Sequence, residues 1–241
     1  HSNIPILGLI GHSDKLTSLI VPKNSKSVLS ESFRSLRTNI QYLAVDKTKK
    51  VITVSSSIGG EGKTFCSMNI ASIFALSGKK TVLIGADLRK PKLELEFKSE
   101  NKSGLSNYLI NKSTLKEITN KTEVENLDII FSGPTPPNPA ELLDSTKMQE
   151  LIKKLNIEYD YVIIDTPPIG LVTDGVILMK NADINLYVVR HNYTKYQALS
   201  VVNGLYNNKK VENLQIIIND YQNDIGNYGY GYGYGYGYGY G

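Results

Sequence analysis

The sequence predicts an α/β fold in which a mostly parallel sheet is flanked by helices on both faces. Short apolar segments alternate along the chain with segments whose apolar residues recur every three or four positions. Several apolar segments are unbroken runs, which is typical of strands buried on both faces of a parallel sheet. In addition, a glycine-rich turn joins one of these runs to a helical segment, as in βα units that bind phosphate.

Six segments are predicted to be strands. Each is a short run rich in branched or aromatic apolar residues and is bounded by polar or turn-forming residues. In chain order they cover residues 51–54, 81–84, 127–131, 161–164, 184–189 and 214–218.

Helices are predicted before and between these strands. Ser30 is expected to cap the first helix, and Gly78 follows the end of the second. The third comes after a proline-rich loop at 133–139. The predicted helices cover residues 31–45, 63–77, 140–155 and 194–206, and the segment 104–122 is expected to be partly helical.

Length and composition indicate one soluble globular domain. The 241 residues carry a net charge of +4, with 41% hydrophobic and 21% charged residues. The basic residues are spread along the chain, so nucleic acid is not an expected partner. No apolar run reaches the roughly 18 residues that a membrane span needs. The single cysteine, Cys66, excludes a disulfide framework and is expected to be a small buried residue.

Three regions are distinguished along the chain. Residues 1–28 are polar and irregular, and are expected to be a connecting arm next to a membrane or an artificial start. Residues 29–222 are expected to form the catalytic domain, and residues 223–241 a flexible tail.

The segment from Ser57 to Thr64 has the spacing of a phosphate-binding loop. Its glycines, Gly59, Gly60 and Gly62, allow the backbone N–H groups to turn toward a phosphate at the start of a helix. Lys63 is positioned to reach the β- and γ-phosphates, and the Thr64 hydroxyl to bind Mg²⁺. The alternative is a glycine-rich turn without a ligand, which the order of strand, loop and helix disfavours.

Two acidic residues follow predicted strands. Asp165 is expected to hold Mg²⁺ opposite Thr64, although a strand-end Asp alone is as often a simple turn cap. Asp87 is a candidate metal ligand or proton acceptor, and Arg89 a candidate partner of a phosphate or of a neighbouring carboxylate, but Asp and Arg are common in loops.

Glu31, Arg34 and Arg37 recur at steps of three on the first predicted helix. They form either a solvated stripe with internal ion pairs or a contact between subunits.

The chain ends in seven tyrosines that alternate with glycine. The glycines make this tail flexible, and its only reactive side chains are phenols, so we expect a substrate for phosphorylation. A sticky low-complexity tail is the alternative. The tyrosines are Tyr228, Tyr230, Tyr232, Tyr234, Tyr236, Tyr238 and Tyr240.

Together these motifs resemble the cytoplasmic catalytic domain of the bacterial tyrosine kinases that regulate capsule and exopolysaccharide export. The resemblance covers about residues 29–241. It rests on the glutamate and arginines at steps of three, the Gly60–Thr64 loop, Ala86–Pro91, Gly133–Leu143, Asp165–Pro168 and the tyrosine tail.

The resemblance implies a P-loop NTPase fold, related to the partition and division-site ATPases, that binds ATP and Mg²⁺. Lys63, Asp87 and Asp165 would be catalytic, and the last two would join Thr64 at the metal. The nucleotide contacts would include Gly59, Gly60, Glu61, Gly62, Lys63, Thr64, Phe65, Arg89 and Asn219.

The resemblance also implies partners. Glu31, Arg34 and Arg37 would join copies into a ring of about eight, in which each tail is phosphorylated by a neighbour. A membrane-embedded chain-length module, fused upstream or separate, and a tyrosine phosphatase would act with the chain at the cytoplasmic face of the bacterial inner membrane.

Two departures from the pattern leave alternatives open. The second motif usually carries two acids, and Gly85 stands where the first is expected, so a catalytically weakened nucleotide-binding scaffold is one alternative. A P-loop ATPase without kinase activity is the other. Ile58 disfavours it, because the partition ATPases have a lysine at that position.

Overall fold

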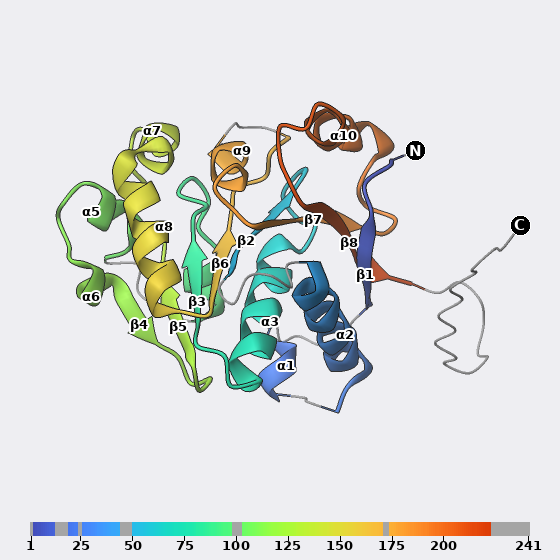
Figure 1. Ribbon diagram of the computed structural model, residues 1–241, viewed down its shortest axis with the longest axis horizontal. Coiled ribbons are helices and arrows are strands. Elements are labelled where there is room, and N and C mark those ends of the chain that lie inside the picture. Colours follow the sequence, from blue (N-terminus) through green and yellow to red (C-terminus); the bar gives the residue numbers. More distant parts are fainter. Residues whose placement is uncertain are drawn as a thin grey trace, which may run out of the picture.

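A computed structural model describes residues 2–12, 19–23, 26–43, 50–97, 103–170 and 174–222. Within these residues the chain forms an eight-stranded sheet of order β1-β8-β7-β2-β6-β3-β5-β4 (Figure 1). All neighbouring strands are parallel except β4, which is antiparallel to β5. The strands are β1 Ile6–Gly11, β2 Lys50–Ser56, β3 Thr81–Gly85, β4 Thr119–Lys121, β5 Leu127–Ile130, β6 Tyr161–Asp165, β7 Ile184–Arg190 and β8 Leu214–Tyr221.

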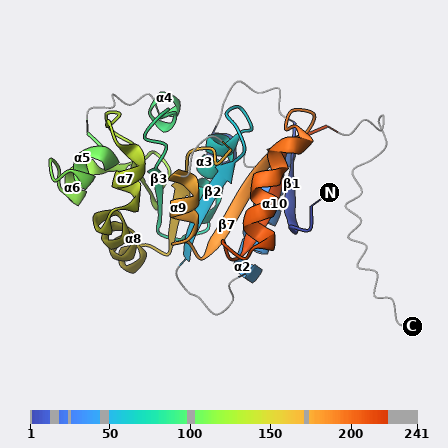
Figure 2. The same cartoon turned by 90° about the horizontal axis from the view of Figure 1, so that it is seen from above.

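Helices cover both faces of the sheet, as Figure 2 shows from above. One face carries α1, α2 and α3, and the other carries α8, α9 and α10. The helices are α1 Ile20–Lys23, α2 Val28–Leu43, α3 Lys63–Leu76, α4 Leu93–Glu96, α5 Leu105–Leu109, α6 Leu115–Ile118, α7 Pro139–Asp144, α8 Thr146–Glu158, α9 Asp174–Met179 and α10 Leu199–Asn207, with a 3-10 turn at Tyr196–Ala198. The predicted fold class is confirmed.

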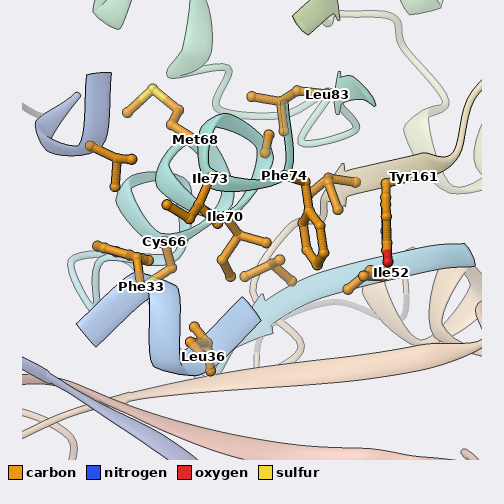
Figure 3. Packing of buried hydrophobic residues seen from close by; sticks show 14 of the residues in the cluster. Phe33, Leu36, Ile52, Cys66, Met68, Ile70, Ile73, Phe74, Leu83 and Tyr161 are labelled. Carbon is orange, nitrogen blue, oxygen red and sulfur yellow. The ribbon is translucent and has the colours of Figure 1, made fainter. Parts of the chain in front are cut away.

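Alternate residues of the central strands enter separate hydrophobic clusters. On β6, Ile163 belongs to the cluster beneath α3, whereas Val162 and Ile164 belong to the cluster beneath α8. In the first cluster Phe74 of α3 stacks on Tyr161, with ring centroids 3.8 Å apart (Figure 3). Because both faces are buried, these strands have no polar face. This accounts for their continuous apolar sequence.

Cys66 lies in the cluster beneath α3 and is fully buried (Figure 3). Burial raises the pKa of its thiol. The expectation of a small buried role is therefore confirmed.

The expectation that the first 28 residues are irregular is wrong. Ile6–Gly11 forms β1 at the edge of the sheet, paired in parallel with β8, and Ile20–Lys23 forms α1. The predicted cap of the next helix is also wrong: the Ser30 N–H donates to the Ser27 hydroxyl at 3.1 Å, so the helix begins earlier, at Val28. The division of the chain at residues 28 and 222 stays a prediction.

Four further differences concern helices and one short strand. The helix predicted over 140–155 is divided at Ser145, whose hydroxyl caps α8 by accepting from the Met148 N–H at 3.2 Å. The segment 194–206 begins as a 3-10 turn, and α4 and α9 were not predicted. The segment 104–122 ends in β4, which is three residues long and exposed along most of its length. Throughout the described residues, no helix is both long and apolar enough to cross a bilayer.

Candidate active site

The predicted motifs meet at the carboxyl ends of three adjacent strands. In the sheet register, Asp165 at the end of β6 pairs with Val54 of β2 on one side and with Gly85 of β3 on the other. The loops that follow β2, β3 and β6 carry the three motifs, so the topology brings them to one edge of the sheet. This is the edge where open α/β sheets bind ligands.

The glycine-rich loop connects β2 to α3 as expected. Gly60 and Gly62 have φ angles of 91° and 88°, in the left-handed region that favours glycine. Lys63 is the first residue of the 14-residue helix α3. The Ser57 hydroxyl, which replaces the small residue usual at the start of the motif, accepts a hydrogen bond from the buried Tyr187 hydroxyl at 2.8 Å.

Lys63, Thr64 and Asp165 form a closed polar cluster. Lys63 Nζ lies 2.8 Å from Asp165 Oδ1, and both side chains are buried, with exposed fractions of 8% and 3%. The Thr64 hydroxyl donates to Asp165 Oδ2 at 2.9 Å. Ser67, one helical turn after Lys63, donates to Asp165 Oδ1 at 2.9 Å. Lys63 and Thr64, predicted from the first motif, are therefore both in contact with Asp165 of the third motif.

Asp87 lies beside this cluster. Burial raises the pKa of its carboxyl group, while the charge of Lys63 and hydrogen bonds from the Lys90 and Arg89 N–H groups oppose that rise. The bond from the Lys90 N–H to Asp87 Oδ1 is 3.0 Å long and holds the side chain within its own loop. A buried carboxyl with a raised pKa next to a lysine has the properties of a proton acceptor.

Side chains from the end of β7, from the residues just after it and from β8 hydrogen-bond to the loop carbonyls. The Asn219 amide donates to the Glu61 carbonyl at 3.0 Å, and Arg190 donates to the Gly60 carbonyl at 3.0 Å. The Tyr193 hydroxyl donates to the Gly59 carbonyl at 3.0 Å. These bonds occupy loop carbonyls and thereby favour N–H groups that point the other way.

The Glu61 side chain has a structural position. It is 1% exposed and accepts hydrogen bonds from the Ile58 N–H, at 2.8 Å, and from the Thr194 hydroxyl. Any nucleotide contact by this residue would therefore come from its backbone.

Arg89 and Phe65 lie apart from the centre of the cluster. Arg89 Nε donates to Asp174 at the start of α9, at 2.7 Å, which leaves less of the guanidinium for a phosphate. The Phe65 ring packs edge-on against Phe33 of α2, with centroids 5.8 Å apart.

The glutamate and arginines of α2 differ in environment. Glu31 and Arg34 form an ion pair on the surface, as the solvated-stripe interpretation expects. The Arg37 Nε atom is buried and has no hydrogen-bond partner within the described residues. Their role between subunits stays a prediction. The seven tail tyrosines, from Tyr228 to Tyr240, lie outside the described residues.

The donor set fits Mg²⁺ bound together with phosphates. Asp165 and Thr64 supply a carboxylate and a hydroxyl oxygen 2.9 Å apart, and Asp87 adds a second carboxylate nearby. Among the described residues no group of three or more His, Cys, Asp or Glu side chains is placed to hold a metal ion. Mg²⁺ typically takes only one or two protein carboxylates and completes its shell with waters and substrate phosphates.

Several residues of the site were not predicted from the sequence, namely Ser67, Asp174, Arg190, Tyr193 and Thr194. Ser67 could have been predicted, since it lies four residues after Lys63 on the same helix face. The last three lie at the end of β7 or just after it. Because β7 is the neighbour of β2, only the strand order reveals this proximity.

Comparison with known proteins finds relatives that match most of this chain. The family described as AAA domain matches residues 49–220. The tyrosine-protein kinase YwqD of Bacillus subtilis is 42% identical over 178 residues, which cover 74% of this chain and 75% of that protein. The tyrosine-protein kinase ptk of Acinetobacter johnsonii is 36% identical over 226 residues, which cover 94% of this chain but 29% of that protein.

Solved structures agree with the fold. The kinase domain of the Escherichia coli tyrosine kinase ETK superposes with a TM-score of 0.84 at 27% identity, covering 96% of this chain and 95% of that one. The septum site-determining protein MinD of Pyrococcus horikoshii, at 24% identity and a TM-score of 0.57, covers 70% of this chain and 68% of its own, and shares the fold.

Proposed function

This chain belongs to the bacterial tyrosine-protein kinases and is a tyrosine-protein kinase, and from that premise we propose that it phosphorylates its own C-terminal tyrosines, Tyr228–Tyr240, in a neighbouring copy. The observation that carries the proposal is the convergence of Lys63, Thr64, Asp87 and Asp165 beside a glycine-rich loop at the carboxyl edge of the sheet.

ATP binding opens the closed pair at the centre of the site. The γ-phosphate draws Lys63 away from Asp165, because a phosphate carries more negative charge than one carboxylate. The backbone N–H groups of residues 59–64 would bind the phosphates, and Asp165 and Thr64 would hold Mg²⁺. The ion neutralises charge on the phosphoryl oxygens when it is bound.

Asp87 accepts the proton of the attacking phenol. A free tyrosine has a pKa near 10, so its hydroxyl is mostly protonated at neutral pH and benefits from a base. The phenol oxygen bonds to the γ-phosphorus as the bond to the β–γ bridging oxygen breaks, and ADP leaves. Lys63 stays on the transferring group and stabilises its charge.

The tail is long enough for transfer between copies. Residues 225–241 span roughly 55 Å when extended at about 3.3 Å per residue. Phosphorylation adds about −1.5 to −2 charges per tyrosine, so a fully modified tail carries roughly ten or more negative charges.

Transfer in trans is tested by mixing two variants, each deficient in one function. A Lys63→Met chain of residues 1–241 retains the tail, and a chain of residues 1–222 retains the active site. With Mg·ATP, phosphosite mapping should find phosphate on the tail of the Lys63→Met chain only when both are present. A chain of residues 1–241 with all seven tail tyrosines changed to Phe is the control for modification elsewhere. Absence of phosphate on that tail in the mixture would contradict transfer between copies.

We further propose that the kinase assembles as a ring of about eight through the α2 stripe of Glu31, Arg34 and Arg37. The exposed pair of Glu31 and Arg34 supports a polar contact. Tail charges that repel one another would then dissociate the ring. Mass measurement before and after treatment with a tyrosine phosphatase tests this, and an equal mass in both states would refute it.

We propose that the kinase acts at the cytoplasmic face of the inner membrane on capsule or exopolysaccharide export. The ptk protein of Acinetobacter johnsonii supports an additional module, because this chain covers only 29% of its length. Copurification of the wild-type chain with a membrane-embedded chain-length module tests the association. Glu31→Ala and Lys63→Met variants are purified in parallel for comparison.

A further inference from the structure

Glu94 on α4 is a buried acid that has no role in the proposed phosphoryl transfer. Its side chain is 4% exposed. Its Oε1 atom accepts a hydrogen bond of 2.7 Å from the Ser132 N–H. Its Oε2 atom is also buried, and within the described residues it has no hydrogen-bond partner. Buried carboxylate oxygens are rarely left without a partner, so Oε2 calls for a ligand.

The carboxylate lies close to position 85, the place where the second motif lacks an acid. A Cβ atom added to Gly85 would lie 2.8 Å from the Ser132 hydroxyl, 3.3 Å from the Ser132 nitrogen and 3.1 Å from Leu93. The Ser132 nitrogen is thus a neighbour both of Glu94 Oε1 and of the space beside Gly85. Gly85 itself pairs in register with Asp165. Glu94 therefore approaches the metal-binding edge of the sheet from α4.

We propose that Glu94 supplies the carboxylate that Gly85 lacks, with its Oε2 atom ordering a water molecule of the Mg²⁺ shell. Glu94 is then a positioning residue, which acts through the bound water. This inference rests on the proposed Mg·ATP site.

The two oxygens of Glu94 have separable roles. Oε1 joins α4 to the residue after β5, and an amide oxygen can accept the same bond. Oε2 contributes nothing to that anchor, because it accepts no bond from the described residues. A Glu94→Gln change therefore keeps the anchor and replaces Oε2 with an amide nitrogen.

The experiment measures Mg²⁺ affinity separately from catalysis. Mg²⁺ is titrated into the full chain in the presence of a fluorescent ADP analogue, for the wild type, Glu94→Gln and Glu96→Gln. Glu96 is exposed on the same helix and gives the same change in net charge. Loss of an outer-shell partner weakens metal binding about 10–100-fold in known sites. We expect at least a tenfold rise in the Mg²⁺ dissociation constant for Glu94→Gln and less than a twofold rise for Glu96→Gln.

Two further measurements distinguish positioning from a purely structural role. ADP binding in EDTA and the thermal midpoint should match the wild type in Glu94→Gln, and adding Gly85→Asp to it should restore Mg²⁺ affinity. If the Mg²⁺ dissociation constant of Glu94→Gln equals that of the wild type, whether or not the thermal midpoint falls, the role of Glu94 is refuted while the proposed function stands. A wild-type chain that binds no ADP with Mg²⁺ would overturn the proposed function with it.

Discussion

Replacing Lys63 by Met should destabilise the protein as well as inactivate it. The change leaves Asp165 buried without its cation, which lies 2.8 Å away in the wild type. Loss of one partner from a buried ion pair typically costs about 3–5 kcal/mol. Because the Thr64 and Ser67 hydroxyls still donate to the carboxylate, we expect the lower end of that range. At about 2–4 °C per kcal/mol for a domain of this size, the thermal midpoint should fall by roughly 6–12 °C.

A double-mutant cycle tests the origin of this loss. Urea unfolding at 25 °C without nucleotide gives the unfolding free energies of the wild type, Lys63→Met, Asp165→Asn and the double variant. If the pair is formed before nucleotide binds, the double variant should be more stable than the sum of the single changes implies, with a coupling energy of about 1–3 kcal/mol. Additive single effects, or a Lys63→Met chain as stable as the wild type, would refute the closed pair.

Three further predictions concern Asp87, Gly62 and Asp220. Asp87→Asn should raise the thermal midpoint and lower the phosphorylation rate about 100-fold or more. Burial raises the folded-state pKa of Asp87, so wild-type stability should fall as pH rises from the unfolded pKa through the folded one. Thermal midpoints measured at several pH values should show this fall in the wild type and not in Asp87→Asn. Gly62→Ala should abolish ADP binding in the fluorescence titration, because φ is +88° and the new Cβ would lie 2.0 Å from Asn219 Nδ2; unchanged binding would contradict the loop geometry. Burial raises the pKa of Asp220, but hydrogen bonds from His12 and from an arginine of β7 outweigh it and lower the pKa. The resulting stabilisation is present above the unfolded pKa of about 4 and is lost as pH falls through the lower folded value, so the wild type should lose more stability in acid than Asp220→Asn, as unfolding at several pH values can check.

The elements that were predicted correctly depend on local sequence. The strand, glycine turn and helix around Lys63 follow from a contiguous pattern, and the apolar runs identify the central strands because each is buried on both faces. β1 could not be predicted from the local sequence, because it is an edge strand that is only partly buried and contains Gly8 and Gly11. Its partner, β8, is about two hundred residues away in the chain, so the local sequence does not indicate the pairing.

The site shows the same division between local and distant information. The contacts of Lys63 with Asp165 could be anticipated, since the carboxyl ends of neighbouring parallel strands share an edge. The bond from Arg89 to Asp174 could not, because α9 was not predicted and the two residues are 85 positions apart. Glu94 carries no motif, and only its burial beside Ser132 distinguishes it from other glutamates.

The bonds from β7 and β8 to the glycine-rich loop have a consequence for the order of folding during synthesis. The loop is complete once residue 64 has been made, but the side chains that hold it, Arg190, Tyr193 and Asn219, follow more than 120 residues later. β1 likewise waits for β8, the last strand of the described chain. Contacts so distant in sequence form late and slow the folding of a domain. A nascent chain that ends before Asn219 should therefore bind nucleotide poorly, and ATP should bind only once nearly the whole domain has been synthesised.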